Sequence, residues 1–211
     1  MKKTTLLFGG AFDPPHKSHI LTALTAIGHE KFDSNTELWF LPCYSDAFGH
    51  KNLTSPTHRI AMLNHVLKCI GGKKFKICTT EIEMANLAGT YAVVKELINI
   101  HPDREFYYVI GSDQAGSIRR WRNSRDLLKT IPFITVRRPL GFGYIEWCFN
   151  TPHIWIEEPI KIPNIPHGKT FQSSEIRRIF HDVWEETKKY IPEGLLLDTY
   201  QYIINHELYK K

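Results

Sequence analysis

The sequence has little of what marks disulfide-bonded, zinc-binding or membrane-spanning proteins. Only four of its 211 residues are cysteines, and none forms a C-x-x-C pair, so we expect reduced thiols that mostly pack in the interior. No apolar run approaches the ~20 residues that cross a bilayer, so no membrane partner is expected. The start, Met1-Lys2-Lys3-Thr4, passes directly into an apolar run, so we expect no signal peptide. These absences together predict a cytoplasmic protein.

Arginine-rich tails, low-complexity tracts and internal repeats are also missing from the chain. The formal net charge is +5, yet the basic residues are scattered and form no aromatic-basic pattern of the kind that reads RNA. We therefore expect no nucleic-acid partner, and the positive charge favours a small polyphosphate ligand. The hydrophobic content of 42% and the length fit one domain spanning residues 1–211.

Strand and helix patterns alternate along the chain up to about residue 138. Short apolar runs predict strands at residues 5–8, 37–42, 75–78, 105–110 and 133–136. Helical spacing of apolar residues predicts helices at residues 20–27, 56–67, 92–100 and 124–129. This alternation predicts an α/β fold, a Rossmann-like doubly wound parallel sheet with helices on both faces. Ligands of such sheets bind beyond the carboxyl ends of the strands.

The pattern weakens between residues 139 and 171. Five prolines in this segment exclude a long helix, and only residues 153–156 resemble a strand. We expect an irregular segment that covers the active site or forms an oligomer contact. Beyond it, a C-terminal helical segment is predicted by residues that recur every four positions: Leu196, Tyr200, Ile204 and Leu208.

The most informative stretch is residues 9–19, which read Gly-Gly-Ala-Phe-Asp-Pro-Pro-His-Lys-Ser-His directly after the first predicted strand. Gly9 and Gly10 let a backbone approach a ligand closely because they lack a Cβ atom. His16 and His19 are three residues apart where a helix should begin, so both imidazoles share one face of its first turn. The helix N-terminus adds free N–H groups and partial positive charge, which suits a phosphate.

Two other interpretations of these histidines stay open at this stage. They could be surface residues, or they could bind a metal ion. The metal interpretation lacks a third ligand, because Asp13 precedes a rigid Pro-Pro pair and is expected to point elsewhere.

A second polar segment, Phe-Gln-Ser-Ser-Glu-Ile-Arg-Arg at residues 171–178, precedes an amphipathic helix. Ser173 or Ser174 is expected to be its N-cap. The segment could be only a capped helix. Alternatively, the serine hydroxyls, the free N–H groups and Arg177 converge on one place that can hold phosphate oxygens.

These two segments resemble the signatures of the H-x-x-H (often H-x-G-H) nucleotidyltransferase superfamily. The form Gly-Gly-x-Phe-Asp-Pro is typical of nicotinate or nicotinamide mononucleotide adenylyltransferases. Ser18 stands where many members have glycine. The second segment is similar to the family's I-S-S-T-x-I-R signature, with Gln172 in place of the first serine. The resemblance covers nearly the whole chain and is weakest between residues 139 and 171.

The resemblance implies an ATP site and names its residues. His16, His19 and Arg177 would be the catalytic residues. The ATP-binding set would be Gly9, Gly10, Phe12, His16, His19, Gly111, Asp113, Arg137, Ser173, Ser174 and Arg177. Gly111-Ser112-Asp113 resembles the I-G-x-D motif that faces the adenosine, although alone it could be a turn. Arg137 and Arg138 match an R/K-R-P element near phosphate, and one of the two could be a solvated surface charge.

The resemblance also implies a mononucleotide site, formed by Gly10, Ala11, Phe12, Lys51, Thr90, Tyr91 and Trp121. Lys51 would contact the mononucleotide phosphate, whereas Arg59 could bind ligand or be structural. Trp121 matches a tryptophan that stacks on the pyridine ring, although it could be a surface aromatic residue. Thr90-Tyr91-Ala92 departs from the family's S-Y-T motif, which affects the choice between the acid and the amide of the ring.

The implied reaction is adenylyl transfer from ATP to a pyridine mononucleotide, with Mg²⁺ bound mainly through ATP and no metal site on the protein. The two histidines would donate hydrogen bonds to phosphate, with at least one gaining from protonation. The compact, bacterial-type layout favours nicotinate mononucleotide. Phosphopantetheine or CDP-alcohol chemistry, a non-catalytic nucleotide sensor and an RNA-binding module are the alternatives. A homo-oligomer is compatible with the sequence.

Overall fold

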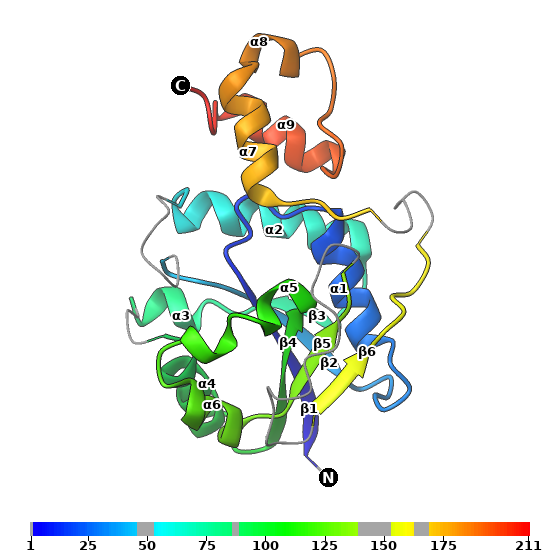
Figure 1. The fold of residues 1–211 in the computed structure, drawn as a ribbon, viewed down its shortest axis with the longest axis vertical. Helices are drawn as coiled ribbons and strands as arrows, with labels where there is room; N and C mark the ends of the chain where they lie inside the picture. Colours follow the sequence, from blue (N-terminus) through cyan, green and yellow to red (C-terminus); the bar gives the residue numbers. More distant parts are fainter. Residues whose placement is uncertain (1, 46–52, 86–88, 139–152, 163–168) are drawn as a thin grey trace.

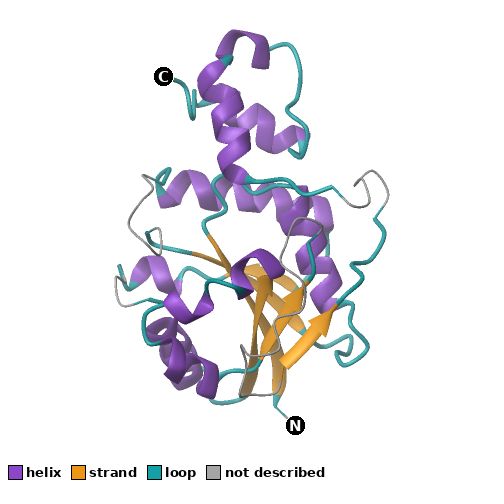
Figure 2. Ribbon diagram, viewed as in Figure 1, coloured by secondary structure: helices purple, strands orange, loops and turns teal. Residues whose placement is uncertain are grey.

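The computed structural model describes residues 2–45, 53–85, 89–138, 153–162 and 169–211. These residues form a six-stranded sheet in the order β3-β2-β1-β4-β5-β6, and all neighbouring strands are parallel (Figures 1 and 2). The strands are β1 (Lys3–Gly10), β2 (Glu37–Pro42), β3 (Phe75–Ile77), β4 (Arg104–Gly111), β5 (Phe133–Val136) and β6 (His153–Ile156). The predicted α/β fold is therefore confirmed, and residues 153–156 form the edge strand β6.

Helices connect the strands and follow the last of them. They are α1 (Lys17–Ile27), α2 (Pro56–Ile70), α3 (Thr80–Glu83), α4 (Thr90–Ile100), α5 (Ser112–Ala115), η1 (Ile118–Arg120), α6 (Ser124–Thr130), α7 (Ser173–Asp182), α8 (Trp184–Thr187) and α9 (Leu197–Asn205). No helix in the described part of the chain is long and apolar enough to cross a bilayer.

Each face of the sheet is covered by its own helices. Leu6, Phe8 and Val109 pack with apolar residues of α1 and α2. On the other face, Leu7 and Tyr108 pack with residues of α4 and α6. Successive side chains of a strand point to opposite faces, so a strand covered on both sides reads as one continuous apolar run. This explains why the strands are visible in the sequence.

The strand order reverses between β1 and β4. From β1 the chain proceeds to β2 on one side, and it later returns to β4 on the other side. At the carboxyl edge Gly10 lies beside Pro42, and Gly111 lies beside Val136. A doubly wound sheet opens a crevice at this point, so the end of β1 is where the fold can accept a ligand.

The C-terminal helices form a separate apolar cluster on α2. Met62 of α2 packs with Ile176, Phe180 and Ile203, and Figure 1 shows α7, α8 and α9 grouped beyond one end of the sheet. The start of α7 thereby approaches the carboxyl edge of β1.

The expectation that the cysteines mostly pack in the interior is only partly met: Cys78 is buried, but Cys69 on α2 is exposed.

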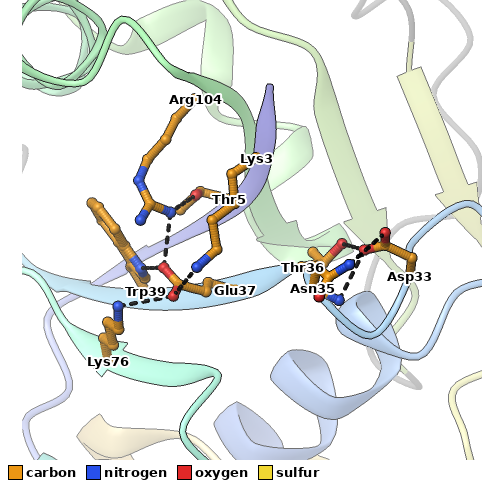
Figure 3. A network of polar contacts seen from close by, with 9 residues as sticks. All are labelled: Lys3, Thr5, Asp33, Asn35, Thr36, Glu37, Trp39, Lys76 and Arg104. Carbon is orange, nitrogen blue, oxygen red and sulfur yellow. Dashed lines mark hydrogen bonds and ion pairs between the residues drawn. The ribbon is translucent and has the colours of Figure 1, made fainter. Parts of the chain in front are cut away.

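The opposite edge of the sheet holds a charge network around Glu37, drawn in Figure 3. Its carboxylate, whose side chain is 8% exposed, accepts from Lys3 at 2.6 Å, Lys76 at 2.9 Å and Arg104 at 2.8 Å. The indole N–H of Trp39 donates at 3.0 Å. Burial alone would raise the pKa of Glu37, but these partners outweigh it and lower the pKa from 4.5 to about 2.

Glu37→Gln is expected to destabilise the fold by about 2–3 kcal/mol at pH 7. The reason is that a pKa lowered by folding means that the folded protein stabilises the ionised carboxylate. This stabilisation is complete above pH 4.5 and disappears as the pH falls towards 2. Urea unfolding of wild type, Glu37→Gln and the exposed neighbour Glu105→Gln, at pH 7 and pH 3, measures it. Equal unfolding free energies for Glu37→Gln and wild type at pH 7 would contradict the assignment.

Candidate active site

Two segments more than 150 residues apart meet at the carboxyl edge of the sheet. The hydroxyl of Ser173 donates to the carbonyl of Pro14 at 2.9 Å, and Arg177 donates to the carbonyl of Asp13. The backbone N–H of Phe171 donates to the hydroxyl of Ser18 at 2.8 Å. The start of α7 is therefore fixed against the loop that leads into α1. The two segments singled out in the sequence therefore lie side by side.

His16 and His19 stand at the start of α1, as expected. His16 is the N-cap, and its backbone N–H donates to Nδ1 of His19 at 3.2 Å. The ring centroids are 3.8 Å apart. Because Nδ1 of His19 accepts this bond, the proton of the neutral ring is on Nε2. His19 thus has an N–H donor available on the other side of the ring.

The ring of Phe12 packs against this histidine pair. Its side chain is 1% exposed, and its ring meets His19 edge-on at 5.0 Å and Phe8 at 5.5 Å. Its φ angle of 49° turns the chain sharply between β1 and the proline loop. The side chain therefore positions His19, and only the backbone of Phe12 is placed to touch a ligand.

Both imidazoles are neutral at pH 7. Burial lowers the pKa of His16 to about 3, with a further contribution from Arg138. Burial also holds the pKa of His19 well below 6.5, helped by His16 and Arg138. The expectation that one histidine gains from protonation concerns the complex with phosphate and stays a prediction. The positive charge of the site comes from arginine.

Arg138, and not Arg137, lies beside the histidines. The Arg138 side chain is 13% exposed and pairs with Asp113 at 3.2 Å. Arg137 pairs with Glu157 beyond the end of β6, and its side chain is 46% exposed. Of the two arginines that the sequence left open, Arg137 is thus the more exposed, and its ATP-binding role stays a prediction. A Cβ atom on Gly111 would lie 2.5 Å from Nε of Arg138, so any larger residue there would displace the Arg138 side chain.

Asp13 and Arg59 are both buried and bond to the chain around the loop after β1. The Asp13 carboxylate accepts from the backbone N–H of Thr54 at 3.1 Å and from the hydroxyl of Tyr209 at 2.7 Å. Arg59 is fully buried and donates to the carbonyls of Thr54 and Ala11, each at 2.9 Å. These bonds fix the loop after β1 from behind and settle the alternative that was open for Arg59.

The serine N-cap prediction for α7 is wrong by one residue. Gln172 is the N-cap and makes no side-chain capping bond, while Ser173 is the first helical residue. The Ser173 hydroxyl donates to the Pro14 carbonyl instead, because α7 packs on the loop before α1. The exposed Ser174 and the first N–H groups of α7 remain at the helix start, where they suit an anion.

The other side of Gly9 and Gly10 is lined by aromatic residues. A Cβ atom on Gly9 would lie 1.8 Å from the hydroxyl of Tyr108, so this tyrosine requires the glycine. Trp121 follows η1, and its ring centroid is 6.1 Å from that of Tyr108. Thr90 and Tyr91 begin α4 on the same side and are half-buried. Lys51 lies outside the described residues.

The comparisons with known proteins agree with this geometry. The family model described as cytidylyltransferase-like matches residues 7–179. A probable nicotinate-nucleotide adenylyltransferase of Bacillus licheniformis is 36% identical over 155 residues, which is 73% of this chain and 77% of the relative. The protein of that name in Listeria monocytogenes is 31% identical and covers all of both chains. This chain belongs to that family of adenylyltransferases.

Solved structures place the fold in the same family. A Plasmodium falciparum nicotinic acid mononucleotide adenylyltransferase complexed with NaAD has a TM-score of 0.75 and 25% identity, covering 98% of this chain and 97% of that one. The chain is thus an enzyme of the nucleotidyltransferase class.

Proposed function

We propose that this enzyme transfers the AMP group of ATP to nicotinate mononucleotide, releasing pyrophosphate and forming nicotinate adenine dinucleotide for NAD biosynthesis. The observation that carries the proposal is the junction of the two segments. The bonds from Ser173 to Pro14 and from Arg177 to Asp13 bring the α7 N-terminus to the loop that leads into the histidine pair. A triphosphate lying across this junction meets donors along its length.

The mononucleotide phosphate is already ionised at neutral pH, so its attack on the α-phosphorus needs no general base. The bond from the α-phosphorus to the bridging oxygen breaks as the new P–O bond forms, and pyrophosphate leaves with the electron pair. Catalysis then consists of alignment and charge neutralisation. Nε2–H of His19 and the ring of His16 donate to α-phosphate oxygens, and Arg138 supplies positive charge beside them.

Arg177, Ser174 and the N–H groups of α7 hold the departing pyrophosphate in this proposal. Arg177 is 22% exposed and can move from its backbone acceptor to a phosphate within the same reach. Among the described residues no group of three or more His, Cys, Asp or Glu side chains is placed to hold a metal. We propose that Mg²⁺ would be bound mainly through ATP and would supply positive charge that offsets the charge of the polyphosphate.

The substrates are assigned to the two sides of β1. Gly111, the Asp113–Arg138 pair and the start of α7 form the ATP side. Gly10, Ala11, Thr90, Tyr91, Trp121 and, by resemblance, Lys51 form the mononucleotide side. The Trp121 ring faces a cationic pyridinium, a pairing worth about 0.5–2 kcal/mol. We place the reaction in the cytoplasm.

Incubation of the enzyme with ATP, Mg²⁺ and nicotinate mononucleotide should yield the dinucleotide and equimolar pyrophosphate, measured by chromatography and a coupled pyrophosphate assay. Nicotinamide mononucleotide and phosphopantetheine, assayed in parallel, separate the alternatives. Turnover with phosphopantetheine alone would replace the proposal by another transferase activity. Nucleotide binding without pyrophosphate release from any acceptor would indicate a non-catalytic sensor.

A further inference from the structure

A buried glutamate lies on the mononucleotide side of the site and has no part in the mechanism above. Glu81 belongs to the short helix α3, is 9% exposed, and accepts from the backbone N–H of Tyr44 at 3.1 Å. Its neighbour Glu83 on the same helix is exposed. A carboxylate is rarely buried without a full ionic partner, so its position requires an explanation.

The surroundings of Glu81 connect it to the pyridine end of the substrate. Glu81 is close enough to Tyr108 to act on that hydroxyl electrostatically, and the hydroxyl hydrogen-bonds the side chain of Thr90. The same hydroxyl lies against Gly9. Thr90 belongs to the motif that the resemblance places at the substituent of the pyridine ring. In the proposed complex, Glu81 would therefore lie one side chain behind that substituent.

Among the described residues, three charged or titratable groups interact with Glu81 or with its neighbour Tyr108. They are Arg59 of α2, Tyr108 of β4, and Cys43 beside that tyrosine after β2. Burial raises the pKa of Glu81 to about 7, although the Tyr44 N–H and the Arg59 guanidinium oppose this. Arg59 is itself committed to two backbone carbonyls. Glu81 consequently changes charge close to neutral pH.

We propose that Glu81 is a specificity-determining residue, and that its charge makes the choice between the acid and the amide of the pyridine ring depend on pH. Neutral Glu81 tolerates the carboxylate of nicotinate. Ionised Glu81 repels that carboxylate and leaves the uncharged amide of nicotinamide almost unaffected. The inference rests on the proposed function, since it concerns the same pocket.

The test is the ratio of kcat/KM for nicotinate mononucleotide to kcat/KM for nicotinamide mononucleotide, measured between pH 6 and pH 8.5. The mononucleotide phosphate and the two histidines are common to both reactions, so their titration cancels in the ratio. For wild type we expect the ratio to fall about tenfold as the pH rises, because two like charges then share a weakly screened pocket. For Glu81→Gln we expect, at every pH measured, the ratio that wild type has at low pH.

Glu83→Gln is the matched control, since it removes a carboxylate from the same helix at an exposed position, and it should follow wild type. Circular dichroism and thermal unfolding of Glu81→Gln show whether it folds. If that variant is unfolded, the pH-dependent ratio of wild type still decides. A wild-type ratio that is constant with pH, or that changes equally in Glu81→Gln, overturns the inference while leaving the proposed function intact. Loss of the proposed function would instead appear as no dinucleotide from either substrate.

Discussion

His19→Ala should lower kcat by 10²- to 10³-fold and change the dissociation constant of ATP much less. The Nε2–H of His19 is the neutral donor that the capping bond from His16 fixes in place. Its hydrogen bond strengthens as charge builds on the α-phosphate, so its loss affects the transition state more than the bound substrate. Steady-state kinetics gives kcat, and calorimetry with ATP gives the dissociation constant.

The control for this variant is His181→Ala. His181 is an exposed histidine on α7 that pairs with Asp182, so its removal should leave kcat unchanged. Because Phe12 packs on His19, the unfolding temperature of both variants must be compared with wild type. A folded His19→Ala enzyme with near-normal kcat would contradict the assigned role.

The second large effect is expected from substitutions of two adjacent arginines, Arg137 and Arg138. Arg138→Ala should reduce kcat/KM for ATP about 10- to 100-fold, because it removes the buried cation beside the two neutral imidazoles. Arg137→Ala should stay within about threefold, since an exposed ion pair with Glu157 contributes little. The two variants differ by one position, so composition and general charge are matched.

The ranking of these two variants is the decisive result. Arg138→Lys separates the effect of charge from that of geometry, because lysine keeps the positive charge but lacks the planar guanidinium that binds phosphate with two bonds. If Arg137→Ala is the more damaging variant, the arginine was assigned wrongly, and Arg137 rather than Arg138 belongs to the ATP side.

Much of the fold could be predicted because its strands are buried on both faces. The runs at 105–110 and 133–136 are largely apolar, and β4 and β5 occupy them within one residue at each end. The four-residue helices α3, α5 and α8 were not predicted. A single turn of helix is too short to show the 3.6-residue period, and its formation depends on tertiary contacts.

The site was predictable where its residues form local patterns and not where tertiary contacts decide. The histidine pair and the α7 segment are each one continuous stretch of sequence, and the structure brings the two stretches together. Whether Arg137 or Arg138 faces the site depends on where the edge strand β6 places Glu157, which no local pattern contains. The Asp13–Tyr209 bond links residues at opposite ends of the chain and was missed for the same reason. Glu81 gave no local signal, because Glu83 lies two residues further along the same short polar segment.

The central claim is that one triphosphate lies between the histidine pair and the start of α7. The most direct measurement is a crystal structure with a non-hydrolysable ATP analogue and Mg²⁺. We predict the α-phosphate within hydrogen-bond distance of Nε2 of His19, and the terminal phosphates on Arg177 and the first N–H groups of α7. A triphosphate bound elsewhere, with Arg177 still on the Asp13 carbonyl and both imidazoles untouched, would contradict the account.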